Sequence, residues 1–266
     1  MSLIPKIGLP KTGLGAFIVD GVADGYEAFA IAQALKEANS DGPLLFVARD
    51  GQRLPAIVEA LSFVAPGLPV LELPAWDCLP YDRVSPGSEV AARRLDALTA
   101  MIALAAKPHR AVVLTTANAL LQRIPPADLV EAQTFNAKPG NQIDMNRLVA
   151  RLETSGFERV PTVRGIGEFA VRGGILDLFA PGWSEALRLD FFGDTLESIR
   201  AFDVASQRTT GQRHAMSLQA MSEVALTPET ISRFRRAYIE AFGAPSRDDG
   251  LYAAVSEGRR FAGMEH

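Results

Sequence analysis

The first half of the chain alternates short apolar runs with longer segments of helical periodicity. Continuous apolar runs are typical of parallel strands covered on both faces, and they predict strands at residues 16–19, 44–48, 69–73 and 111–115. Between these runs, apolar residues recur at three- and four-residue spacing and predict helices at residues 25–38, 52–63 and 88–106. Alternating strands and helices predict a doubly wound parallel sheet, which is an α/β fold.

The pattern changes after Pro125 and Pro126, because consecutive prolines lack backbone donors and favour extended chain. The pattern after these prolines predicts one helix at residues 145–155. Short strands separated by Gly, Pro or Asp are predicted after it, at residues 159–164, 168–171, 175–179, 186–192 and 196–202. This order predicts a second, α+β domain on an antiparallel sheet. A final helical pattern at residues 228–242 has no clear stop, so we expect the last segment to be truncated.

The alternation of side chains along the predicted strand at residues 186–192 indicates which of them face the protein interior. Strand alternation places the aliphatic residues and Phe191 on one face, and Arg188, Asp190 and Phe192 on the other. If the aliphatic face is the core, Phe192 is exposed beside an arginine, a combination typical of an interface hot spot. If a helix covers the second face as well, Phe192 is buried. The pattern alone favours neither arrangement.

Composition narrows the possible functions. With 266 residues and 48% hydrophobic content, the chain can bury a substantial core. The formal net charge of −4 disfavours tight, sequence-independent DNA binding, although weak DNA contact is a hypothesis for Arg93, Arg94, Arg110 and Arg123. The single cysteine, the lack of a membrane-length apolar run and the lack of a signal peptide predict a cytoplasmic protein.

Nucleotide and metal sites are not predicted. Gly8 and Gly13 have the spacing of a phosphate-binding loop, but Leu14-Gly15 stands where Lys and Ser/Thr are needed, and the spacing precedes the first strand. His109 and His214 lie over a hundred residues apart, and Cys78 has no partner at ligand spacing.

No catalytic pair is predicted either. Asp177, Asp190 and Asp194 could cluster on adjacent strands, but alternate carboxylates on a half-exposed sheet are more often solvated. Trp76 and Tyr81 lie on a loop between prolines, where aromatic rings can stack on nucleic-acid bases or pack onto their own domain. The acidic charge balance favours packing.

Two longer segments carry a family resemblance. Residues 73–86 read LPAWDCLPYDRVSP, and residues 168–179 and 188–200 read EFAVRGGILDLF and RLDFFGDTLESIR. Their order and spacing resemble the signature segments of the bacterial transcription-repair coupling factor family, and the resemblance covers roughly residues 14 to 240.

The resemblance implies three domains. Residues 1–126 are expected to form a degenerate P-loop, helicase-like parallel sheet domain similar to UvrB domain 1a. Residues 127–213 are expected to form an inserted, smaller α+β domain similar to UvrB domain 2, which binds UvrA. Residues 214–266 would begin a segment similar to UvrB domain 1b.

The implied function is recruitment of UvrA in transcription-coupled nucleotide excision repair. The family's UvrA-contacting residues correspond to Arg172, Arg188 and Phe192. This region of the family has no catalytic activity; ATP and Mg²⁺, RNA polymerase and double-stranded DNA are expected at other domains, and a C-terminal domain is expected to mask the UvrA-binding face. The alternative is a nucleotide- or DNA-binding helicase-like domain with residual ATPase activity or direct DNA contact.

Overall fold

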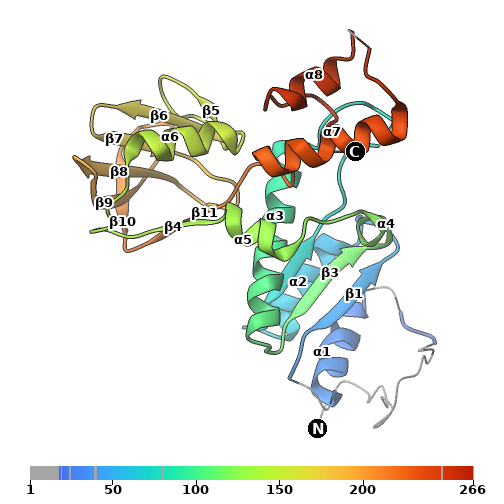
Figure 1. Ribbon diagram of the computed structural model, residues 1–266. Coiled ribbons are helices and arrows are strands. Elements are labelled where there is room, and N and C mark those ends of the chain that lie inside the picture. The colour runs from blue at the N-terminus through green and yellow to red at the C-terminus, as the bar shows by residue number, and fades with distance from the viewer. Residues whose placement is uncertain are drawn as a thin grey trace. The chain divides into compact units, whose positions relative to one another are not determined.

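A computed structural model describes residues 18, 20–23, 25–38, 41–79, 81–246 and 248–265. The chain divides into two compact units, Met1–Ala75 with Ala97–Arg123 and Trp76–Asp96 with Ile124–His266, and Figure 1 shows their elements in chain order. The division falls inside helix α3 (Ser88–Ala106). The glycine spacing at residues 8–13 lies outside the described residues, as does the strand predicted at residues 16–19 except for Ile18. The predicted domain boundaries at residues 126 and 213 stay predictions.

The first unit contains a parallel sheet, as predicted. Its strands stand in the order β1-β3-β2, and both pairings are parallel. The bounds are β1 (Leu44–Ala48), β2 (Val70–Leu73), β3 (Val112–Thr116), α1 (Glu27–Glu37), α2 (Leu54–Val64) and α4 (Ala117–Leu121). All five residues of the central strand β3 are buried, which explains the apolar run at residues 111–114. The mixed α/β character is therefore confirmed.

The second unit contains the predicted antiparallel sheet. Six strands stand in the order β10-β9-β8-β7-β6-β5, and only the short β5–β6 pairing is parallel. The bounds are β5 (Glu158–Arg159), β6 (Glu168–Arg172), β7 (Ile175–Leu178), β8 (Ala186–Phe192), β9 (Thr195–Phe202) and β10 (Thr209–Arg213). The remaining elements are β4 (Phe135–Ala137), β11 (Met216–Leu218), α5 (Ala127–Gln133), α6 (Met145–Thr154), α7 (Pro228–Phe242) and α8 (Gly250–Ser256).

Helix α6 covers one face of the six-stranded sheet (Figure 1). It begins at Asp144, whose side chain accepts hydrogen bonds from the backbone N–H groups of Asn146 and Arg147. Its buried Leu148 and Leu152 belong to the same apolar cluster as the inward residues of β6 to β9. The apolar cluster of the opposite face has four buried members, Val163, Ala170, Ala186 and Phe202. Polar side chains occupy more of that second face.

The differences from prediction concern short elements. The strand predicted at residues 159–164 ends at Arg159, because Pro161 cannot donate a ladder hydrogen bond. The sequence did not predict six short elements, which are strands β4, β10 and β11 and helices α4, α5 and α8. Each of these strands and helices has three to seven residues, too few to establish a clear hydrophobic period.

The environment of Asp96 on α3 is expected to make the free energy of unfolding depend on pH. A Cβ at Gly182, whose φ is +76°, would lie 1.8 Å from a carboxylate oxygen of Asp96, and burial raises the pKa of Asp96 to about 6. Because the folded-state pKa exceeds its ordinary value of 3.8, folding favours the protonated acid, and this contribution is lost as the pH rises from about 4 through about 6. We expect Asp96→Asn to raise the free energy of unfolding by about 1 kcal/mol at pH 8, a value discounted for partial exposure.

Urea denaturation of the wild type and Asp96→Asn at pH 4 and pH 8 measures this difference. The gain should be much smaller at pH 4, where the folded wild type keeps Asp96 protonated and the unfolded chain is only partly ionised at this residue. The exposed Asp194 provides a control, and Asp194→Asn should change stability little at either pH. An equal gain for Asp96→Asn at both pH values would contradict a role for its titration.

Candidate functional site

The second face of the six-stranded sheet carries an exposed phenylalanine. Along β8, Leu187, Leu189 and Phe191 are buried in the core, whereas Phe192 is 77% exposed. The predicted alternation of this strand is confirmed. The exposure of Phe192 also decides between the two arrangements that the sequence left open, in favour of an uncovered position.

Asp177 organises the arginines on this face. It lies on β7 opposite Arg188 of β8, and its side chain is fully buried. Arg188 donates from Nε and Nη2 to the two carboxylate oxygens at 2.7 and 2.8 Å, and Arg172 of β6 donates from Nη2 at 2.5 Å. The hydrogen bond to Asp177 raises the pKa of Arg188 above its ordinary value. Two strands therefore present guanidinium groups held by one carboxylate.

A second ion pair extends these contacts to β9. Arg200 donates to both carboxylate oxygens of Asp190, at 2.9 and 2.7 Å, and Ser198 donates to one of them. Burial acts to raise the pKa of Asp190, but the hydrogen bonds from Arg200 and Ser198 outweigh it and hold the pKa below its usual range. We call Arg172, Asp177, Arg188, Asp190 and Arg200 the arginine–aspartate cluster.

Phe192 lies beyond this cluster, at the end of β8. It is four residues from Arg188, or about 13 Å along the strand. The turn to β9 uses Gly193 with φ +59°, a left-handed conformation that favours glycine. The Arg188 guanidinium lies over the ring of Phe202, 4.7 Å from its centroid, which further fixes its orientation. The face thus combines oriented cations with a separate apolar anchor.

Residues 135–224 match the family model of the UvrB interaction domain. We refer to this matched segment as the UvrB interaction domain. All residues of the arginine–aspartate cluster and Phe192 lie inside it.

The chain is also similar to transcription-repair-coupling factors. That of Rickettsia bellii (strain RML369-C) is 32% identical over 237 residues, covering 89% of this chain and 21% of the relative. The Escherichia coli (strain K12) factor is 32% identical over 225 residues, covering 85% and 19%. The Myxococcus xanthus factor is 36% identical over 219 residues, covering 80% and 18%. The chain spans about a fifth of the length of these curated relatives.

Within the UvrB interaction domain, the structure joins two of the three predicted site residues. Arg172 and Arg188 meet at Asp177, whereas Phe192 lies four residues beyond Arg188 on β8 and is outside the arginine–aspartate cluster. The interpretation of Asp177 as solvated was wrong, because its side chain is 0% exposed. Arg200 was not predicted. The sequence signal for the burial of Asp177 and for the role of Arg200 is the occurrence of arginines and aspartates at alternate positions of neighbouring strands.

A buried ion pair connects the end of the UvrB interaction domain to α3, inside the second unit. The guanidinium of Arg94, 0% exposed, donates to the Glu223 carboxylate, which also accepts from Trp76 Nε1 at 2.9 Å. The guanidinium lies 5.4 Å from the Trp76 ring centroid. The hypothesis that Arg94 contacts DNA is therefore wrong. The packing interpretation is confirmed for Trp76 and wrong for Tyr81, which is 91% exposed.

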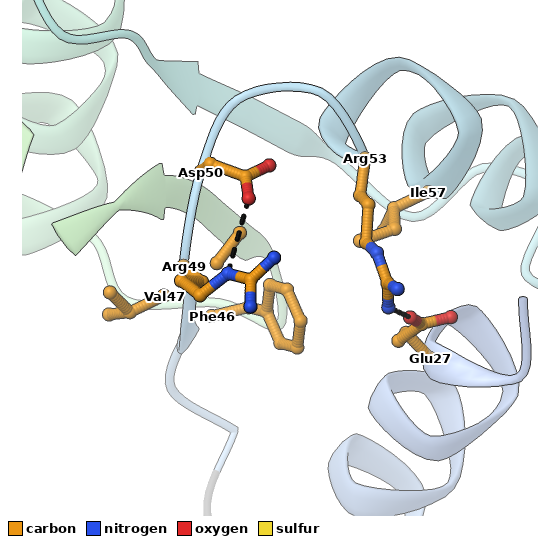
Figure 2. Close-up of a pocket in the computed structure, with 8 residues that line it drawn as sticks. Glu27, Phe46, Val47, Arg49, Asp50, Arg53 and Ile57 are labelled. Carbon is orange, nitrogen blue, oxygen red and sulfur yellow. Dashed lines mark hydrogen bonds and ion pairs between the residues drawn. The ribbon is translucent and has the colours of Figure 1, made fainter. Parts of the chain in front are cut away.

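The first unit has a cavity of about 280 Å³ at the carboxyl end of β1 (Figure 2). Such an edge is where open α/β sheets bind ligands. Here Arg53 pairs with Glu27 at 3.1 Å and Arg49 pairs with Asp50 at 3.3 Å. The described residues that line the cavity include no Lys, Ser or Thr. This composition does not favour a nucleotide site.

Other candidate chemistry finds little support. Burial, with the nearby charges of Asp77, Asp82 and Glu265, raises the pKa of the Cys78 thiol, which disfavours a nucleophilic thiolate. Among the residues that the structure describes, no three His, Cys, Asp or Glu side chains gather as metal ligands. In the same part of the chain, no helix combines the length and apolarity that a membrane span requires.

Proposed function

We propose that this chain recruits UvrA in transcription-coupled nucleotide excision repair, as a binding module without catalysis of its own. The observation that carries the proposal is the exposed Phe192 on the same sheet face as oriented arginines, within a UvrB interaction domain. Similarity to transcription-repair-coupling factors supports the repair pathway. In this proposal Arg172, Arg188 and Phe192 form the UvrA-binding residues.

The three residues are suited to different tasks. Phe192 exposes an apolar ring that can fill a pocket of a partner. The Arg172 side chain is 50% exposed and, among the described residues, donates from Nη2 to Asp177 alone, so its remaining N–H groups can reach partner carboxylates. The Arg188 side chain is 16% exposed, so it offers the partner a smaller edge. We therefore expect Phe192 and Arg172 to contribute most of the binding energy.

Titration of this chain against UvrA tests the proposal. We expect Phe192→Ala to weaken binding by about 2 kcal/mol, roughly 30-fold in Kd. Because the ring is 77% exposed, its removal should leave the thermal melt almost unchanged. The double variant Arg188→Ala/Phe192→Ala should abolish measurable binding, with its fold checked by the same melt.

Phe63 provides a matched control, since it is 87% exposed and lies on α2 of the other unit. Phe63→Ala removes the same type of exposed side chain and should leave UvrA affinity unchanged. Equal affinities of the wild type and Phe192→Ala would refute the assignment of this face. Wild-type protein that does not bind UvrA would refute the proposed function itself.

The finer architecture and the remaining partners are also proposals. The first unit is proposed to be a degenerate helicase-like domain, and the parallel order β1-β3-β2 supports this. The division at residues 126 and 213 is proposed on the same resemblance. Contacts with RNA polymerase and double-stranded DNA, and the masking C-terminal domain, are assigned to other parts of a longer protein, because the chain spans about a fifth of its relatives.

A further inference from the structure

A cavity of about 280 Å³ in the second unit is lined by two arginines, Arg151 and Arg260, for which the described part of the chain provides no ion-pair partner. Its lining comes from the end of α5, the end of α6, the segment before α7, and Arg260. Among the described residues, the guanidiniums of Arg151 and Arg260 form no ion pair and donate only to backbone carbonyls. Arginines that leave bulk water are normally paired with an anion.

Each guanidinium is held in place and partly desolvated. Arg151 donates to the carbonyl of Ala132 at 3.0 Å and lies 5.5 Å from the centroid of the Phe135 ring. Arg260 makes two long contacts, of 3.4 Å, with the carbonyls of Thr154 and Val224. Burial lowers the pKa of both arginines below the ordinary value, and Glu265 opposes this at Arg260. The neighbouring backbone therefore compensates only part of the two charges.

The surroundings of Arg260 leave hydrogen-bonding capacity unused. Its Nε is buried and has no hydrogen-bond partner among the described residues. Gly156, with φ +94°, lets this nitrogen approach closely, since a Cβ there would lie 3.1 Å from it. Glu265 is the carboxylate that acts electrostatically on Arg260, but one of its oxygens accepts from the hydroxyl of Ser85. A buried donor without an acceptor is rare in native proteins.

We propose that Arg151 and Arg260 form a binding site for a small oxyanion of the phosphate or carboxylate class. The guanidinium fork matches the oxygens of either group. The cavity is near the lower limit of small-ligand sites, so it admits one such group with little else. The site is separate from the arginine–aspartate cluster and does not depend on UvrA recruitment.

Calorimetric titration with inorganic phosphate tests this site, with chloride keeping the ionic strength constant. We expect saturable binding to the wild type and a phosphate-dependent rise in Tm of about 3 °C or more near saturation. Arg151→Gln and Arg260→Gln should each lose the saturable heat. Matched controls are Arg147→Gln on the same helix and Arg259→Gln beside Arg260, whose side chains are 89% and 65% exposed; both should bind like the wild type.

Two further measurements keep the result interpretable. If Arg260→Gln fails to fold, Arg151→Lys keeps the charge but loses the fork, and it should bind phosphate at least about tenfold more weakly. Acetate in place of phosphate separates the two sources: binding of phosphate alone assigns a phosphate group, and binding of acetate assigns a carboxylate. An identical response in the wild type and the cavity variants, or no response to either anion, overturns the proposal.

Discussion

Replacing Glu223 with alanine is expected to lower the free energy of unfolding by about 3–5 kcal/mol. The reason is that Arg94, whose side chain is 0% exposed, would lose the Glu223 carboxylate that accepts from its buried guanidinium. Trp76 would also lose the acceptor of its indole N–H. Urea denaturation monitored by tryptophan fluorescence measures the loss, and Trp76 reports directly on the affected contact.

Two variants separate the ion pair from a general effect of losing a carboxylate. Glu240 lies exposed on α7, and Glu240→Ala should change stability by less than about 0.5 kcal/mol. The double variant Arg94→Met/Glu223→Leu removes both charges and should recover much of the loss, because an apolar pair needs no desolvation of ions. A loss below about 1 kcal/mol for Glu223→Ala would show that water reaches Arg94.

The regular elements of the fold could be predicted because their hydrophobic periods are long. Residues 88–106 and 186–192 form a helix and a strand with the predicted bounds. In both, core burial follows the periodicity of the sequence. The division of the second unit could not be predicted in the same way. It joins Trp76–Asp96 to Ile124–His266. The hydrophobic pattern of a local segment does not indicate which distant segment it contacts, such as Trp76 with Glu223.

The candidate site shows the same limit for polar residues. Strand parity placed Arg188 and Phe192 correctly on one face, because parity depends only on the spacing of neighbours along one strand. The burial of Asp177 depends on registers between three strands, β6 to β8. The burial of Glu223 likewise depends on its contact with Arg94 of α3, 129 positions away in sequence. A carboxylate is usually exposed, so composition alone predicted the wrong environment for Asp177.

Replacing Asp177 with alanine is expected to reduce both stability and UvrA binding. The fully buried carboxylate holds two guanidiniums, and without it the mostly buried Arg188 would retain an uncompensated charge. We expect a loss of about 3 kcal/mol in the free energy of unfolding, at the lower end for a broken buried pair, because Arg172 is half exposed and can turn to water. Urea denaturation measures the stability and titration with UvrA measures the binding.

The pattern across variants separates orientation from contact. Phe192→Ala should weaken UvrA binding at unchanged stability, whereas Asp177→Ala should weaken binding even under conditions where the variant is fully folded, because Arg172 loses the acceptor that orients it. Asp177→Asn keeps the side-chain shape without the charge and should fall between the wild type and alanine in both measurements. Glu197 lies exposed on β9, and Glu197→Ala should affect neither. Full UvrA affinity of folded Asp177→Ala would mean that the arginines bind without this carboxylate, leaving Phe192 as the principal anchor of the face.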